Sequence, residues 1–180
     1  MINKFPLPIK ENALFDLKQD PCIAKIKESD YESIIDTAWT KGTEVALEIT
    51  EVLAEERNFS KILHERGIKV IEQDKDYIVG KTRYFSEYIT GKNEIYLYSK
   101  SILIWAKENN LTYEEAKNYI LAHEFYHYLE WTKIGMTSKL YTVPLITIGE
   151  FKIGRTGIRA ISEIAANAFV HKIFEMEDVQ

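Results

Sequence analysis

The sequence predicts an α+β fold in which a small antiparallel sheet accompanies a buried central helix and a C-terminal helix. Apolar residues recur at helical spacing in the first and last thirds of the chain, whereas short alternating segments lie between them. The chain has 180 residues, of which 46% are hydrophobic and 28% are charged, as is ordinary for one globular domain. We therefore expect an N-terminal arm over residues 1–30 and a single domain over residues 31–180.

The first half of the chain predicts an arm, a long helix and a strand. Three of the four prolines lie in the first 21 residues, which indicates an extended segment with one helical turn near residues 11–18. Residues 31–66 carry apolar side chains at helical spacing, and Gly67 supplies the expected end of that helix. Residues 68–71 then alternate as a short strand does.

The middle of the chain predicts a β-hairpin. Residues 83–90 are rich in aromatic and β-branched side chains, Gly91-Lys92-Asn93 supplies a turn, and residues 94–98 alternate. We expect the edge of this hairpin near Tyr96 and Tyr98 to be exposed, where it would accept an extended peptide as an added strand.

Two helices follow the hairpin. A short one covers residues 101–108, and a longer one begins at Thr112, which forms a capping box with Glu115. Gly135 is a natural stop for the longer helix. Its beginning and its end are therefore both marked in the sequence.

The last third of the chain predicts a loop and a final helix. Proline and glycine interrupt residues 136–157, which we expect to be a loop with one short extended pair at 143–148 and 150–153. The final helix is predicted over residues 158–176.

The strongest chemical signal is an HExxH run at residues 123–127, inside the longer helix. Residues four apart lie on one face of an α-helix, so His123 and His127 can point at a single metal ion. Glu124 projects from the same side, where it can hold a water and act as a general base, as in zinc peptidases. Residues 119–131 are nearly all apolar, so the helix is predicted to be buried, and two buried histidines need a partner such as a metal. A packed core histidine would explain one such residue better than it explains this pair.

Catalytic zinc usually takes a third protein ligand, and several residues are candidates. Glu130 lies one turn after the HExxH run on the same helix, which disfavours closure of a tetrahedral site. Glu150 lies in the predicted loop and His171 in the final helix. We favour Glu163, because the alanines that follow it would let its helix approach closely. Asn167 lies four residues later on the same face, where it would hydrogen-bond the free ring nitrogen of a ligand histidine.

The net charge and the cysteine content indicate which binding partners and which cellular compartment to expect. The net charge is −5 and no stripe of Lys and Arg stands out, so direct nucleic-acid binding is not expected. Cys22 is the only cysteine, which fits a reducing compartment. The first residues lack the apolar core of a signal peptide, and no apolar run approaches the length of a membrane span. We therefore expect a cytoplasmic protein with no membrane partner.

Residues 163–169, Glu-Ile-Ala-Ala-Asn-Ala-Phe, resemble the ExxANxF segment that follows the HExxH helix in the ImmA/IrrE family of zinc-dependent endopeptidases. The resemblance covers about residues 43–176. It implies a zincin-like minimal domain, of the gluzincin kind, that binds Zn²⁺ through the two HExxH histidines and Glu163 and uses Glu124 as the base. Members of that family often cleave a helix-turn-helix repressor, so the resemblance also implies a protein or peptide substrate such as a transcriptional repressor.

The leading hypothesis is a zinc metallopeptidase in which metal-activated water hydrolyses a peptide bond. Tyr141, in the predicted loop, is a candidate for stabilising the transition state. The alternative is a catalytically silent zinc-binding module that sequesters a regulatory partner. Glu124 favours the enzyme, because binding alone would not need a base. A protein with no metal would require the His pair and Glu163 to be unrelated.

Overall fold

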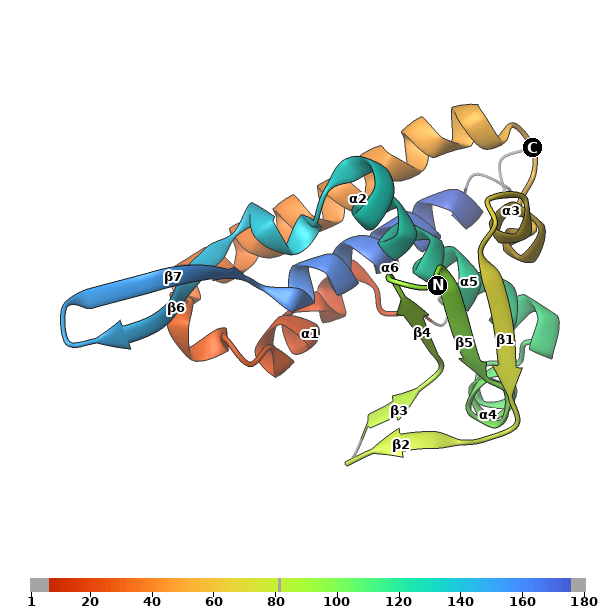
Figure 1. Cartoon of the computed structure of the whole chain (residues 1–180), viewed down its shortest axis with the longest axis horizontal. Coiled ribbons are helices and arrows are strands. Elements are labelled where there is room, and N and C mark those ends of the chain that lie inside the picture. Colours follow the sequence, from red (N-terminus) through yellow and green to blue (C-terminus); the bar gives the residue numbers. More distant parts are fainter. Residues whose placement is uncertain (1–6, 81, 176–180) are drawn as a thin grey trace. The chain divides into compact units, whose positions relative to one another are not determined.

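The computed structural model describes residues 7–80 and 82–175, which cluster into two compact units. The first unit comprises Met1–Val52 and Lys133–Gln180, and the second comprises Leu53–Thr132. Each unit contains helices and at least one β-sheet (Figure 1), so the α+β class is confirmed. A domain boundary at residue 30 stays a prediction.

The first unit is mainly helical. The predicted final helix is confirmed as α6, although its predicted end at Met176 lies outside the described residues.

Within the described residues, no helix combines the length and the apolar character needed to span a bilayer. The elements of this unit are η1 (Lys10–Asn12), α1 (Ala13–Gln19), η2 (Ile23–Lys25), η3 (Glu28–Asp30), α2 (Tyr31–Leu53), η5 (Thr137–Leu140), β6 (Thr142–Ile148), β7 (Phe151–Gly157) and α6 (Arg159–Glu175).

The segment that was expected to form an arm contributes to the core of this unit. The predicted helical turn is present as η1 and α1, and Ala13 and Leu17 of α1 are buried in an apolar cluster with residues of α2 and α6. The buried carboxylate of Asp20 accepts a hydrogen bond of 2.9 Å from the backbone N–H of Ala160. That N–H lies in the first turn of α6, where helical backbone donors have no intrahelical partner. The side chain of Asp20 therefore satisfies the start of α6.

Helices α2 and α6 cross closely at a glycine. A Cβ atom added at Gly42 would lie 2.0 Å from the carbonyl oxygen of Ala165 and 2.9 Å from the Cβ of Ala168. Only a residue without a side chain fits this crossing. Two of the alanines that follow Glu163 are therefore used to pack α6 against α2 within the first unit.

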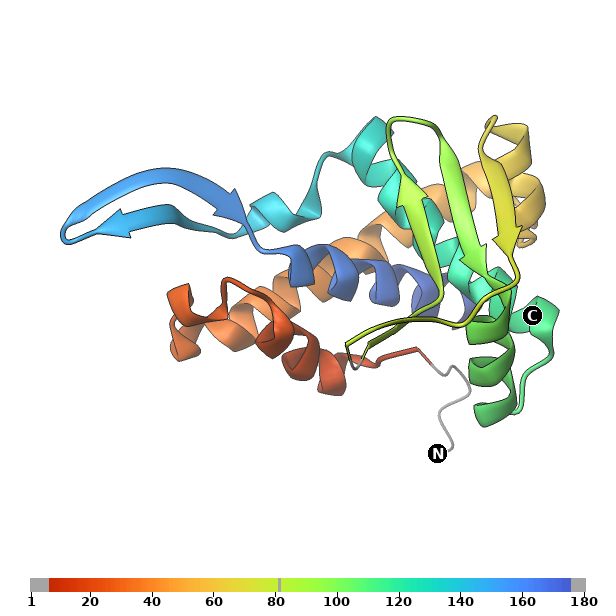
Figure 2. The same cartoon turned by 60° about the horizontal axis from the view of Figure 1, so that its bottom comes forward.

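The predicted loop at residues 136–157 is more regular than expected. It contains η5 and an antiparallel hairpin, β6–β7, whose register pairs Thr142 with Gly157 and Ile148 with Phe151. The predicted extended pair is thus confirmed, and its strands are longer than the sequence indicated. Figure 2 shows the hairpin reaching away from the helices of its own unit.

The predicted helix over residues 31–66 is wrong as one element. Helix α2 ends at Leu53, Ala54 has a positive φ of 52°, and Asn58 caps a separate helix at the start of the second unit, which also holds the HExxH helix. The helical period continues across this break, which is why the sequence pattern concealed it. The elements are α3 (Phe59–Glu65), β1 (Lys69–Gln73), β2 (Tyr77–Val79), β3 (Thr82–Tyr84), β4 (Ser86–Ile89), β5 (Glu94–Tyr98), α4 (Ser99–Glu108), α5 (Tyr113–Leu129) and the start of the π-helical turn η4 (Glu130–Ile134).

The main sheet of this unit has the order β1-β5-β4 and is mixed. The predicted hairpin is confirmed as the antiparallel pair β4–β5, but β1 lies parallel to β5, so the expectation of a purely antiparallel sheet is wrong. Strand β5 carries Tyr96 and Tyr98 and is paired on both sides. The predicted peptide-accepting edge is therefore wrong as well, because the edges of this sheet are β1 and β4. A small separate hairpin, β2–β3, connects β1 to β4.

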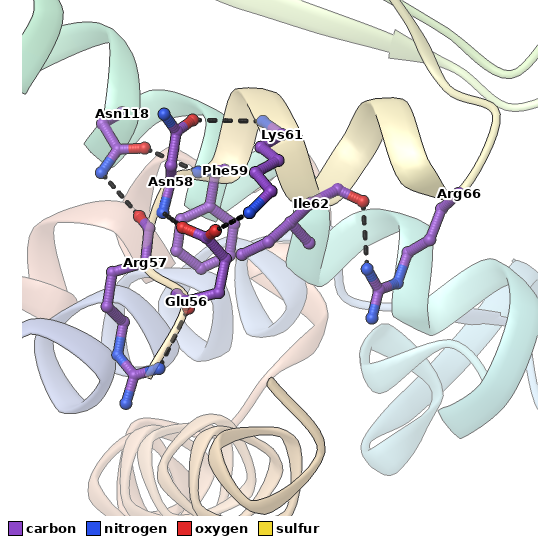
Figure 3. A network of polar contacts seen from close by, with 8 residues as sticks. All are labelled: Glu56, Arg57, Asn58, Phe59, Lys61, Ile62, Arg66 and Asn118. Carbon is purple, nitrogen blue, oxygen red and sulfur yellow. Dashed lines mark hydrogen bonds and ion pairs between the residues drawn. The ribbon is translucent and has the colours of Figure 1, made fainter. Parts of the chain in front are cut away.

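An amide side chain fixes the HExxH helix to its neighbour α3 (Figure 3). Asn118 of α5 accepts a hydrogen bond of 2.8 Å from the backbone N–H of Phe59 and donates one of 2.9 Å to the carbonyl of Arg57. Phe59 also packs on Phe125, with ring centroids 5.6 Å apart, and the guanidinium of Arg66 lies 5.1 Å from the centroid of Phe125. These contacts hold α5 on both sides of His123 and Glu124.

Candidate metal centre

The helix α5 positions both histidines of the HExxH run. Its predicted capping box is present: the Thr112 hydroxyl accepts from the backbone N–H of Glu115, and the Glu115 carboxylate accepts from the backbone N–H of Thr112. The first turn is thereby satisfied. Since the helix continues without interruption to Leu129, His123 and His127 lie one turn apart on the same face.

The two imidazoles converge. The Nε2 atoms of His123 and His127 are 3.1 Å apart, and the ring centroids are 4.9 Å apart. Two nitrogens bound at ~2.0–2.1 Å to one zinc ion in tetrahedral geometry lie roughly 3.4 Å from each other. The observed separation is close to this value, so it fits two nitrogens that bind one ion. Each ring presents its Nε2 atom to the position that the ion would occupy.

Glu130 holds the other nitrogen of His127. Its Oε2 atom lies 2.8 Å from Nδ1 of His127, and its side chain is only 1% exposed. The carboxylate is an acceptor for Nδ1–H, which leaves the Nε2 lone pair of the neutral ring free for a metal. The chain leaves the regular α-helix at Glu130 and continues as the π-helical turn η4. Glu130 was considered in the sequence as a ligand and disfavoured, and the structure places its carboxylate against Nδ1 of His127.

Glu130→Leu should weaken zinc binding by roughly 10- to 100-fold, because His127 loses the acceptor that sets its tautomer and ring orientation. Glu130→Gln keeps an acceptor oxygen and should fall between Glu130→Leu and the wild type. Zinc affinity is measured by competition with a chromophoric chelator, and circular dichroism of the metal-free proteins controls for folding. Equal affinity in all three proteins would show that this hydrogen bond does not support the metal site.

The base candidate, Glu124, is held by the neighbouring sheet. Its side chain is buried, at 6% exposed for the residue, and the Ser86 hydroxyl donates a hydrogen bond of 2.5 Å to Oε1 of Glu124. Ser86 is the first residue of the edge strand β4. Nothing in the local sequence marked Ser86, because the contact joins residues 38 positions apart. It places the edge strand directly beside Glu124.

Among the described residues, one group could hold a metal ion, and it consists of His123, His127 and Glu163. Their ligand atoms all lie within 4.8 Å of one another. Glu163 also lies 3.7 Å from the exposed Arg159 on its own helix, an i,i+4 pair of a kind that contributes little at a surface. Glu163, which we favoured from the sequence as the third ligand, therefore belongs to this group.

The other third-ligand candidates have different surroundings. Glu150 is exposed, in the turn between β6 and β7. His171 is buried and packs on Trp39 with ring centroids 5.7 Å apart, and its Nε2 lies 3.2 Å from the carbonyl oxygen of Pro8. Neither belongs to the group of potential ligands. Asn167 is buried in α6, and its hydrogen bond to a ligand histidine stays a prediction.

Tyr141 is engaged elsewhere in the first unit. Its hydroxyl donates a hydrogen bond of 2.8 Å to Oδ2 of Asp30, and this bond raises the pKa of Tyr141 above its ordinary value. Both residues line a hollow of about 290 Å³ between the start of α2 and the η5 segment. A role for Tyr141 in stabilising a transition state stays a prediction.

Comparison of the chain with known proteins finds no match among family models, curated proteins or solved structures. The interpretation of the candidate metal centre therefore rests on its geometry and on the sequence.

Proposed function

We propose that this protein is a zinc-dependent endopeptidase. The observation that carries the proposal is the convergence of the two Nε2 atoms of the HExxH pair, 3.1 Å apart, with Glu163 in the same potential ligand group and Glu124 beside it. The donor set, two imidazoles and one carboxylate, is the set that catalytic zinc takes when it keeps one position open. The resemblance of residues 163–169 to the ExxANxF segment supports the same assignment.

Each residue of the candidate site would have its own role in peptide hydrolysis. When bound, zinc would lower the pKa of a water molecule and polarise the scissile carbonyl. Glu124 would take a proton from that water and deliver it to the leaving amine nitrogen. Because the Ser86 hydroxyl occupies Oε1 of Glu124, we assign Oε2 as the oxygen that accepts the proton. Glu130 would keep the ring of His127 oriented throughout the reaction.

The position of β4 supports an extended peptide as the substrate. β4 is an edge strand of its sheet, and its first residue, Ser86, contacts the base. A peptide that adds to this edge as a further strand would run past Glu124 with its backbone carbonyls held in order. The family resemblance adds a regulatory protein, such as a helix-turn-helix repressor, as the class from which this peptide would come.

The proposal is tested by incubating the full chain with an unstructured peptide library and identifying the products by mass spectrometry. Cleavage should occur in the zinc-loaded protein, disappear after removal of the metal with a chelator, and return when zinc is restored. The chelator alone, added to a serine peptidase in the same assay, controls for effects on the peptides. Cleavage that persists in the metal-free protein would contradict a metallopeptidase. A zinc-loaded protein that cleaves neither the library nor a candidate repressor would favour the silent binding module.

A further inference from the structure

The β6–β7 hairpin of the first unit carries a row of large apolar side chains in water. Four large apolar side chains form this row, and each of them is about half exposed or more. The residues and their exposed fractions are Ile146 at 49%, Ile148 at 64%, Phe151 at 76% and Ile153 at 56%.

The register of the hairpin places all four on one face. Directly opposed residues of an antiparallel pair share a face, and Ile146 pairs with Ile153 while Ile148 pairs with Phe151. Neighbours along a strand alternate between faces, so Thr147 and its partner Lys152 lie on the opposite side. One face of the outer hairpin is therefore apolar, whereas the opposite face carries the polar pair Thr147 and Lys152 beside Leu145, which is 54% exposed.

The base of the hairpin is anchored in the core of the first unit. Val143 is buried in the apolar cluster of that unit. The ammonium group of Lys25 donates hydrogen bonds of 3.0 Å and 2.8 Å to the carbonyls of Pro144 and Leu145. After β7, the backbone N–H of Ile158 donates to the carbonyl of Ser138 at 2.9 Å. The apolar face is thus presented from a fixed base.

The apolar face matches in area the largest apolar patch of a typical monomeric protein, ~300–600 Å², which is often a functional surface. With ~200 Å² for each large side chain, the exposed fractions leave roughly 500 Å² of apolar surface on the hairpin. Contiguous apolar patches on monomeric proteins rarely exceed a few hundred Å², and larger ones mark interaction sites. Two such faces packed together would bury about 1,000 Å², which reaches the lower limit of a specific protein interface.

We propose that a second copy of this chain covers this face, so that two hairpins pack face to face about a twofold axis. Identical apolar faces are self-complementary, and the twofold arrangement brings each residue against the same patch of its partner. The one charged residue paired within this face, Arg155, is held in its own chain by bonds of 2.7 Å and 2.6 Å to Thr142. This inference does not depend on the proposed peptidase activity.

The charges on and near the hairpin favour a second copy of the chain over a lipid surface as the partner of the apolar face. A membrane-inserting hairpin is typically flanked by several basic residues that meet anionic lipid headgroups. Here Arg155, the basic residue on this face, is bound within its own chain to Thr142, and Lys152 lies on the opposite face. Glu150 lies at the turn, and the whole chain has a net charge of −5. The apolar face therefore fits a second protein surface of the same kind better than it fits an anionic bilayer.

The test is sedimentation equilibrium of the full chain over a range of micromolar concentrations. The wild type should show a mass approaching twice 21.0 kDa. Ile148→Lys should raise the dimer dissociation constant by about tenfold or more, since it places a charge in the apolar contact. Thr147→Lys is the matched control: it adds the same charge one residue away, on the opposite face, and should leave the dimer intact. Ile153→Gln is a second variant on the apolar face, should Ile148→Lys alter the fold by circular dichroism.

Three results would overturn the proposal. One is a monomeric wild type throughout the concentration range. Another is a dimer that Ile148→Lys and Ile153→Gln leave unchanged, or that Thr147→Lys disrupts equally, because the contact would then lie elsewhere. The third is a monomer that sediments with vesicles of phosphatidylcholine and phosphatidylglycerol, which would assign the face to lipid.

Discussion

Glu163→Ala should reduce the zinc content of the purified protein from about one ion per chain to a small fraction of that value. The variant leaves only the two imidazoles of α5, and two ligands hold zinc far more weakly than three. The expectation rests on the potential ligand group of His123, His127 and Glu163. Zinc is measured by inductively coupled plasma mass spectrometry after exhaustive dialysis, with the protein concentration determined independently.

Two further variants show whether the loss is specific to the ligand. Arg159→Ala removes the exposed partner that lies 3.7 Å from Glu163 and should leave the zinc content unchanged. Glu150→Ala removes an exposed carboxylate in the hairpin turn and should also have no effect. Full retention of zinc by Glu163→Ala, with loss in Glu150→Ala or in a His171 variant, would transfer the third-ligand role. Loss in Arg159→Ala would show that the helix, and not the carboxylate ligand, was disturbed.

Glu124→Gln should keep zinc and the fold but lose at least ~100-fold in the rate of peptide cleavage. The amide has the shape of the carboxylate, and its oxygen can still accept the hydrogen bond from Ser86, but it cannot take a proton from water. The rate is measured on a peptide that the wild type cleaves in a zinc-dependent manner. Zinc content and thermal unfolding are measured on the same samples.

Ser86→Ala is the comparison for this variant. It keeps the carboxylate of Glu124 and removes the hydroxyl that holds Oε1, so cleavage should fall less than in Glu124→Gln while zinc remains bound. A Glu124→Gln protein that cleaves at nearly the wild-type rate would disprove the general-base role. Loss of zinc in Glu124→Gln would instead mean that this residue supports the metal.

The two experiments separate the competing functions. A silent zinc-binding module predicts zinc loss in Glu163→Ala and no cleavage by any form of the protein. A peptidase predicts the same zinc loss, together with cleavage by the wild type that Glu124→Gln loses. A protein that uses neither the metal nor the base would show no effect of either substitution on zinc or on cleavage. The hydrogen bond from Ser86 to the buried Glu124 favours the peptidase, because it fixes a carboxylate that zinc binding alone would not need.

Much of the fold and part of the site could be predicted from local sequence. The capping box of Thr112 and Glu115 and the i,i+4 spacing of His123 and His127 depend only on helix geometry, and the structure shows both. The β4–β5 hairpin and the final helix were likewise predicted from turn residues and periodicity. Local patterns failed at Ala54, where a positive φ interrupts a continuous helical period. They also failed for β5, whose alternating pattern does not reveal how many neighbours the strand has.

The sequence by itself therefore determined the helix that carries the two histidines of the HExxH run, because their spacing and the helix cap are properties of a single turn. Only the tertiary structure decided that β5 is the central strand, that Ser86 reaches Glu124, and that the outer hairpin presents one apolar face. Glu130 lies between these cases: its distance along the helix was visible, but the direction of its side chain required the structure. Such contacts depend on strand order and packing between segments far apart in the chain, which no short-range period encodes.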